Sequence, residues 1–218
     1  MKYHRSLIIA VSLLALTPVE GEEMKHWTLG TNLGVAWGDS GNNELSGQLS
    51  ALGLDARANS SDDNRFAWQL RLGYDFTPRW GVELGYVDLG EVETTFTGTA
   101  SDIDTFLSSS RHIHPNTADG FLISGVYRHP IAGIAQLEGV ARAGGFIWSS
   151  EYDLKGVNSS RTVNENGTDL SFGLGLSLEL DQVESLPSGM AAQFDWQRFD
   201  LADEWVDLFS LGLSYRFH

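Results

Sequence analysis

The chain of 218 residues contains no cysteine, and its only lysines are Lys2, Lys25 and Lys155. Without cysteine, neither a disulfide framework nor a thiolate metal site can form. The formal net charge is −15, with 14 Lys and Arg against 29 Asp and Glu. Because neutralising phosphates takes clustered basic side chains, this balance argues against nucleic acid as a partner.

Long hydrophobic runs are also scarce, since only the N-terminal segment comes close to one, and the mean hydropathy is −0.16. A bundle of membrane helices needs several nearly uncharged runs of about 20 residues and is therefore excluded. A membrane protein of this composition has to cross with strands in which apolar and polar residues alternate. Intrinsic disorder also fits modest hydrophobicity and high charge. The aromatic content of 11% and the repeated short apolar runs argue against it.

The N-terminal segment has the organisation of an export signal. A basic start, MKYHR, precedes an apolar stretch over residues 6–16; Pro18 follows, and then Val19 and Gly21 stand as small or tolerated residues at positions −3 and −1 of the expected cleavage site. This order is typical of a cleavable secretory signal peptide. We therefore expect residues 1–21 to be a signal peptide and residues 22–218 to form the exported domain. An uncleaved membrane anchor is the alternative, but its apolar run is short for a spanning helix.

After this segment, apolar and polar residues alternate in eight runs. The runs cover residues 27–38, 66–76, 80–86, 119–129, 134–150, 168–181, 188–199 and 205–217. In the sixth run, Leu170, Phe172, Leu174, Leu176, Leu178 and Leu180 share one parity. Strict alternation marks a strand with one apolar and one polar face. Many of these runs match the roughly 9–11 residues that a tilted strand needs to cross hydrocarbon.

Charged residues recur on the polar parity of these runs. They are Arg71, Glu83, Glu138, Arg142, Glu179, Asp195 and Arg216. On a lipid-facing surface each charge at the bilayer midplane would cost roughly 2–4 kcal/mol. We therefore expect all of these side chains to point inward, where acids and bases pair across a narrow lumen. The sequence thus predicts a luminal charge network.

Aromatic residues gather towards both ends of the runs. One band contains Trp37, Trp68, Tyr86, Phe121, Trp148, Trp196, Trp205 and Phe209, and the other contains Trp27, Phe76, Trp80, Tyr127, Tyr215 and Phe217. Two such bands are typical of the interfacial girdles of a membrane barrel. A soluble β-sandwich is the alternative, because Trp and Tyr favour strands in general. The export signal and the inward charges favour the membrane interpretation.

The connections between runs alternate in length. Short turns are expected at residues 77–79, 129–133 and 181–189, and longer loops at residues 39–65, 96–118 and 153–167, with a brief fourth loop near residues 200–204. Short periplasmic turns and long external loops are the usual asymmetry of outer-membrane barrels. The predicted fold is therefore all-β: an eight-stranded antiparallel up-and-down transmembrane β-barrel, preceded by a cleavable signal peptide.

Two segments carry a family resemblance. The hairpin LGYDFTPRWGVELGY at residues 72–86 and the closing strand SLGLSYRF at residues 210–217 resemble the OmpA transmembrane-domain family, and the similarity extends from about Trp27 to Phe217. This resemblance implies an eight-stranded barrel in the outer membrane of a Gram-negative bacterium, with both termini in the periplasm. It also implies that the inward charges Arg71, Glu83, Glu138 and Arg142 are similar to the family's luminal ion network.

The ends of the chain bear on its expected partners. The family's prototype continues into a periplasmic peptidoglycan-binding domain, whereas this sequence ends at His218, so we expect no cell-wall tether. The penultimate Phe217 resembles the C-terminal aromatic residue that the barrel-assembly machinery recognises. Outer-membrane lipids and lipopolysaccharide are the other expected partners, together with an extracellular or host ligand bound through the loops.

No residue pattern predicts a catalytic, cofactor or metal site. His112 and His114 form an isolated pair in a loop, whereas zinc sites normally have three or four protein ligands. Scattered acidic residues in the long loops fit turn chemistry better than a calcium site. Some small outer-membrane barrels are enzymes that act on lipid through Ser, His and an acid. Here no histidine in or near a run stands beside a serine in the way that a nucleophile and its base require.

These observations predict a non-enzymatic outer-membrane barrel with a structural and surface-interaction role. The alternative is a narrow, porin-like ion channel, because eight strands leave an interior just wide enough for side chains. An enzyme acting on outer-membrane lipid is the third hypothesis, and it has no residue pattern in its favour.

Overall fold

The computed structural model describes residues 26–38, 55–60, 64–90, 94–99, 118–155, 160–201 and 204–217. The strands are β1 (His26–Gly38), β2 (Asp55–Ser60), β3 (Asn64–Asp75), β4 (Trp80–Asp88), β5 (Thr94–Thr99), β6 (Asp119–Pro130), β7 (Leu137–Lys155), β8 (Ser160–Glu179), β9 (Met190–Leu201) and β10 (Glu204–Phe217). Among these residues, no helix is long and apolar enough to cross a membrane.

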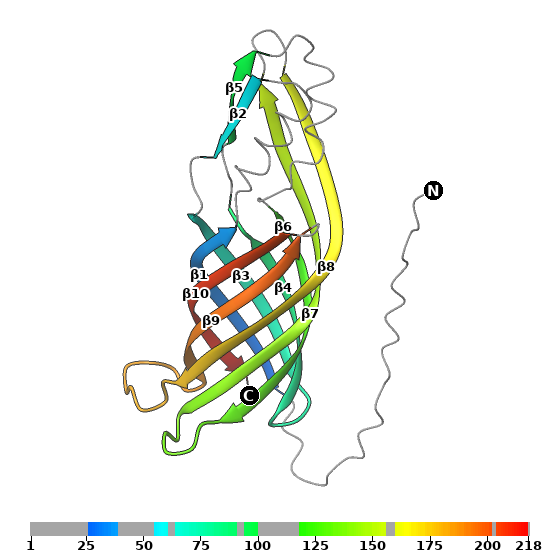
Figure 1. Cartoon of the computed structure of the whole chain (residues 1–218). Helices are drawn as coiled ribbons and strands as arrows, with labels where there is room; N and C mark the ends of the chain where they lie inside the picture. The colour runs from blue at the N-terminus through cyan, green and yellow to red at the C-terminus, as the bar shows by residue number, and fades with distance from the viewer. Residues whose placement is uncertain are drawn as a thin grey trace.

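Eight of the strands close into an antiparallel barrel in the order β1-β10-β9-β8-β7-β6-β4-β3 (Figure 1). Closure is made by the first and last strands, which pair from Trp27 with Phe217 to Gly38 with Val206. Because every barrel strand has two neighbours, the backbone N–H and C=O groups of the wall are paired within the protein. The predicted eight-stranded, all-β barrel is therefore confirmed.

The alternation in the sequence corresponds to the two faces of the wall. Along β3, exposed and buried side chains alternate through most of the strand. The outward parity is apolar, as at Leu33, Leu174 and Leu211, which are all well exposed on the outer surface. The inward parity holds Asn32, Arg71, Arg142 and other polar side chains, which are buried. An apolar exterior around a polar interior is the pattern of a barrel that sits in lipid.

The two ends of the barrel differ. At one end, which we name the turn end, β3 and β4, β6 and β7, and β8 and β9 are joined by residues 76–79, 131–136 and 180–189. The opposite end, the loop end, carries the long connections over residues 39–63 and 91–117, together with the brief one at residues 202–203. Both His26 and Phe217 lie at the turn end, as the pairing of β1 with β10 requires.

One predicted loop is a strand pair. β6 pairs with β7 up to Asp119 and Ser149, but β7 and β8 continue to pair with each other as far as Lys155 and Ser160 (Figure 1). The prediction of a loop over residues 153–167 is therefore wrong. A two-stranded extension beyond the barrel has no lipid-facing side, so its sequence needs no apolar parity and gives no alternation to detect.

A second pair of strands lies within the other predicted loops. β2 pairs with β5 from Asp55 with Thr99 to Ser60 with Thr94, forming a separate two-stranded sheet beyond the loop end (Figure 1). The loops predicted over residues 39–65 and 96–118 thus contain strand segments. Their partners are far apart in the sequence, so local patterns could not reveal this pairing.

Aromatic contacts mark both ends of the outer surface. Near the turn end, the rings of Trp80 and Tyr127 lie 4.8 Å apart, and near the loop end those of Trp37 and Phe209 lie 5.0 Å apart. Trp148 does not belong to the loop-end band in which the sequence placed it. Its side chain is buried inside the barrel and donates a hydrogen bond from Nε1 to Asp169 Oδ2 at 2.7 Å.

Candidate functional site

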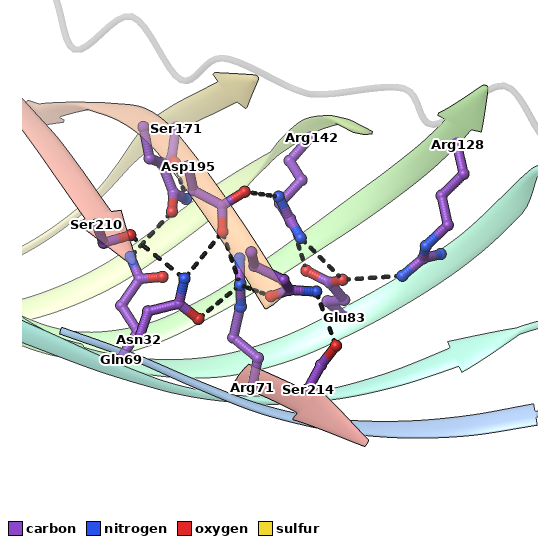
Figure 2. Close-up of polar contacts among 12 residues, drawn as sticks. Asn32, Gln69, Arg71, Glu83, Arg128, Arg142, Ser171, Asp195, Ser210 and Ser214 are labelled. Carbon is purple, nitrogen blue, oxygen red and sulfur yellow. Dashed lines mark hydrogen bonds and ion pairs between the residues drawn. The ribbon is translucent and has the colours of Figure 1, made fainter. Parts of the chain in front are cut away.

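A chain of buried ion pairs crosses the barrel interior (Figure 2). The carboxylate of Asp195 accepts hydrogen bonds from Arg71 Nη2 at 2.9 Å and from Arg142 Nη1 at 2.6 Å. The carboxylate of Glu83 accepts a bond from Arg142 Nε at 2.7 Å and another from Arg128 Nη2 at 3.2 Å. Arg142 therefore bridges two carboxylates, and each of these carboxylates binds two guanidinium groups.

This series of ion pairs, which we name the ion chain, ends at Asp75, which pairs with Arg128. Its six members come from β3, β4, β6, β7 and β9, and they alternate in sign as Arg71, Asp195, Arg142, Glu83, Arg128 and Asp75. None of the six is more than 7% exposed. Moving an ion out of water costs several kcal/mol even in a real protein, so burial on this scale requires a partner for every charge. Three cations and three anions supply that balance.

Two glycines make room for the carboxylates of this ion chain. A Cβ at Gly175 on β8 would collide with Asp195 Oδ1, and a Cβ at Gly81 on β4 would collide with Asp75 Oδ1. Both glycines occupy inward positions directly opposite the carboxylate on the neighbouring strand. Their lack of a side chain therefore permits the acids to lie flat against the barrel wall and reach the arginines.

This fit gives a stability prediction. Replacing Gly175 with alanine is expected to destabilise the folded barrel by about 1–3 kcal/mol, the usual cost of overpacking. Gly125→Ala is the matched control, because Gly125 faces outward with only one atom near its Cβ position, at 3.8 Å. That control should change stability by less than about 1 kcal/mol. Urea unfolding of both variants in lipid vesicles measures the difference, and equal effects would show that Asp195 does not need the space.

The predicted network residues divide into two groups. Arg71, Glu83, Arg142 and Asp195 lie in the ion chain. The other three lie at the turn end rather than in the middle of their strands: Arg216 Nη1 donates to Glu179 Oε1 at 3.2 Å, and the half-buried Glu138 lies near the start of β7, outside the ion chain.

Two members of the ion chain, Arg128 and Asp75, were not predicted from the sequence. Arg128 lies on β6, where both parities are apolar: Phe121 and Ile123 face outward while Leu122 and Val126 face inward. The strand therefore gives no clear polar face. Asp75 is the last residue of β3 and shares its inward parity with Arg71, so the alternation could have identified it.

A layer of neutral polar side chains adjoins the ion chain (Figure 2). Asn32 accepts a hydrogen bond from Arg71 Nη2 at 2.7 Å and donates from Nδ2 to Asp195 at 2.9 Å. Farther towards the loop end, Gln69 Nε2 donates to Gln197 Oε1 at 3.0 Å, and Gln197 Nε2 donates to Ser171 Oγ at 2.9 Å. These amides and hydroxyls link β1, β3, β8 and β9 across the interior.

Beyond the amides, towards the loop end, most inward side chains are apolar, although the buried Arg65 and Ser150 also lie there. We name the apolar side chains the apolar layer; its members are Ala36, Ala67, Val87, Leu89, Ala118, Leu122, Phe146, Trp148, Phe199, Leu201, Val206 and Leu208, each at most 4% exposed. The rings of Phe146 and Phe199 lie 4.9 Å apart near its centre. This layer was not predicted from the sequence, although Phe146 has the same parity on β7 as Arg142.

At the turn end the interior contains a polar cavity of about 60 Å³. Its lining includes Thr28, Ser177, Gln193, Ser214 and the guanidinium groups of Arg128 and Arg216. The interior is thus ordered along the barrel axis, from this cavity through the ion chain and the amides to the apolar layer.

Metal coordination finds no support in the part of the chain that the structure describes. No group of three or more His, Cys, Asp or Glu residues there could hold a metal ion. The loop histidines His112 and His114 lie outside the described residues.

Comparison with known proteins places the chain in a family. The family model described as "Outer membrane protein beta-barrel domain" matches residues 6–217. No curated protein sequence matches the chain.

Among solved structures, the chain is similar to the outer membrane protein OprG of Pseudomonas aeruginosa, at 11% identity over 91% of this chain and 98% of that one, with a TM-score of 0.50. It is also similar to Neisserial surface protein A, at 10% identity over 88% and 97% of the two chains with a TM-score of 0.49. The N-terminal barrel domain of Pseudomonas aeruginosa OprF gives 10% identity over 87% and 97% with a TM-score of 0.48. At such identities the likeness to OprG concerns the fold alone. The family match and the closed eight-stranded barrel together establish that the chain belongs to the outer membrane protein beta-barrel domain family, as an OmpA-type barrel of the outer membrane.

Proposed function

We propose that this protein is a non-enzymatic structural element of the outer membrane that displays its loop end to surface partners. The observation that carries this proposal is the filled interior. The ion chain and the amides link strands that are not neighbours in the wall, and the apolar layer packs beyond them, so side chains occupy the interior where a substrate path would run. The segments available to a partner are therefore those that rise beyond the wall.

The proposal includes an orientation. The turn end and both termini lie in the periplasm, and the loop end faces outside the cell. The length asymmetry of the connections supports this orientation, because outer-membrane barrels have short periplasmic turns and longer external loops. Residues 1–21, which we still take to be the signal peptide, lie outside the described residues. The outward apolar parity contacts outer-membrane lipids and lipopolysaccharide, and the barrel-assembly machinery inserts the chain.

The extension of β7 and β8 supports a role in partner binding. Each strand pairs with the other up to Lys155 and Ser160, beyond the last pairing of β6 at Ser149. Extended backbone rises about 3.3 Å per residue, so the tip of this hairpin stands clear of the barrel rim. The ladder between its strands continues the pairing of β7 and β8 within the wall. The hairpin offers an extracellular or host ligand a preformed surface.

An epitope-insertion experiment tests this orientation and display. An epitope tag inserted in residues 156–159 should bind antibody on intact cells, because the β7–β8 tip lies outside. The same tag in residues 131–136 should bind only after the cells are permeabilised, because that turn lies in the periplasm. The control is heat-modifiable migration of both insertion variants on a detergent gel, which reports a folded barrel. Antibody access to the turn and not to the β7–β8 tip would overturn the proposal.

A narrow ion channel is the second candidate. The observation in its favour is that Arg142 contacts both Glu83 and Asp195, so an exchange of partners would change the shape of the interior. Planar-bilayer recording of the wild-type protein separates the two functions: the scaffold predicts silence, and the channel predicts steady openings. On the channel hypothesis, a substitution within the ion chain should change the conductance. Glu83→Gln is the informative substitution, because it alters the contacts of Arg142 and Arg128, whereas Glu138 lies outside the ion chain.

A further inference from the structure

Polar and apolar side chains are separated along the inside of the barrel. From the turn end to the loop end, the inward positions of β9 are Ala191, Gln193, Asp195, Gln197, Phe199 and Leu201. Those of β7 pass from Glu138 through Arg142 to Phe146 and Trp148. On β10 they pass from Arg216 through Ser214 and Ser210 to Leu208 and Val206. These three strands thus share one gradient from polar or charged to apolar, whereas the inward positions of β3 end in the buried Arg65 at the loop end.

On the polar side of this gradient, several buried polar atoms have no hydrogen-bond partner in the described part of the chain. They include Thr28 Oγ1, Gln69 Oε1, Arg71 Nη1 and Ser124 Oγ. Thr28 lines the cavity at the turn end, and Arg71 belongs to the ion chain. Buried polar groups that lack a protein partner are normally satisfied by water. The cavity is large enough for this, because a water molecule needs about 10–15 Å³ of such volume.

The apolar layer offers water no comparable partners. Its side chains are hydrocarbon apart from the indole N–H of Trp148, which is already bonded to Asp169. Phe146 and Phe199, from β7 and β9, contact each other within it. Hydrophobic constrictions of this kind block ions by excluding water, and a bare ion cannot cross them without a large desolvation cost.

We propose that the interior is a hydrated cavity that opens at the turn end and is closed at the loop end. Water enters the cavity from the turn end and reaches the buried polar atoms beside the ion chain, and the apolar layer seals the loop end. The permeability barrier of the barrel is therefore the apolar layer and not the ion chain. This inference rests on the closed scaffold proposed above, but it does not depend on any partner of the loops.

Cysteine labelling tests the hydration of the two halves. The chain has no native cysteine, so single substitutions are read without background. Ser214→Cys lines the cavity, and Leu208→Cys lies on the same strand and parity within the apolar layer. In lipid vesicles open to a small charged methanethiosulfonate on both sides, Ser214→Cys should react on the order of tenfold faster or more, because apolar burial suppresses the reactive thiolate. Equal rates would overturn the proposal.

Conductance tests which element is the barrier. The double variant Phe146→Ala with Phe199→Ala should give steady ion conductance in planar bilayers, whereas Glu83→Gln should remain silent. The matched control is Phe172→Ala with Phe194→Ala, which removes the same side chains from the outward faces of β8 and β9. If Glu83→Gln conducts and the Phe146/Phe199 variant does not, the ion chain is the barrier and the inference is wrong.

The outcomes separate this inference from the proposed function. Steady conductance of the wild-type protein would contradict the scaffold. Silence of both the wild type and a folded Phe146/Phe199 variant would contradict the seal alone. Heat-modifiable migration on a detergent gel establishes whether the double variant folds. If it fails to fold, the labelling rates of Ser214→Cys and Leu208→Cys still decide the question, because each carries one substitution.

Discussion

Replacement of Asp195 by alanine should lower the free energy of unfolding by about 3–5 kcal/mol, the usual cost of removing one partner from a buried ion pair. Among the residues that the structure describes, Asp195 is the only carboxylate paired with Arg71, and it also binds Arg142. Its removal leaves Arg71 buried with the hydrogen bonds of Asn32 and Gln193 as its remaining described contacts. Urea unfolding in lipid vesicles, followed by tryptophan fluorescence, measures the loss.

Glu179→Ala is the matched control for Asp195→Ala. It also removes a carboxylate from an arginine pair, but the side chains of Arg216 and Glu179 are 31% and 35% exposed. Water therefore solvates the remaining charge, and such pairs contribute about 0–1 kcal/mol. A loss for Asp195→Ala as small as that for Glu179→Ala would contradict the view that the ion chain is a buried, mutually dependent unit.

Replacement of Leu174 by arginine should destabilise the barrel by about 2–4 kcal/mol, the cost of a cation at the bilayer midplane. Leu174 lies on the outward parity of β8, is 60% exposed, and is near the middle of the part of β8 that pairs with β9. The same substitution at Leu170, near the loop end, should cost only about 0–1 kcal/mol, because the penalty falls towards the interface. Urea titration of both variants in vesicles checks this depth dependence.

The depth dependence distinguishes lipid from water outside the wall. In a water-soluble barrel both leucines would face solvent, and arginine would be tolerated equally well at Leu174 and Leu170. Equal stability of the two variants would therefore contradict a membrane location for this face of β8.

Alternation predicts the barrel well because lipid imposes a strict rule on each strand. The outward parity must be apolar, and so the position of Leu174 implies that Ser171 and Ser177 point inward. The same rule placed Arg71, Glu83, Arg142 and Asp195 on the inward side. This rule could not predict which of these side chains form ion pairs, because the pairs depend on the order and register of the strands. In the closed barrel, β9 and β4 lie on opposite sides of β7.

The apolar layer was missed for a different reason. Apolar residues on the inward parity, such as Phe146, Phe199 and Leu208, look like breaks in the alternation when each strand is considered alone. Only the closed barrel shows that they lie at the same end and contact one another. The parity of Trp148 with Arg142 already excluded a place in the outer aromatic band, so that error was avoidable.

The central claim is that one parity of each barrel strand contacts acyl chains while the other faces a filled interior. A spin-label scan of β8, with single cysteines from position 170 to position 179, tests it most directly. In lipid vesicles, even-numbered positions should be accessible to oxygen, with a maximum near Leu174, and odd-numbered positions should be shielded. Oxygen accessibility at Ser171 and Ser177 equal to that at Leu174, or the absence of a period of two, would contradict the claim.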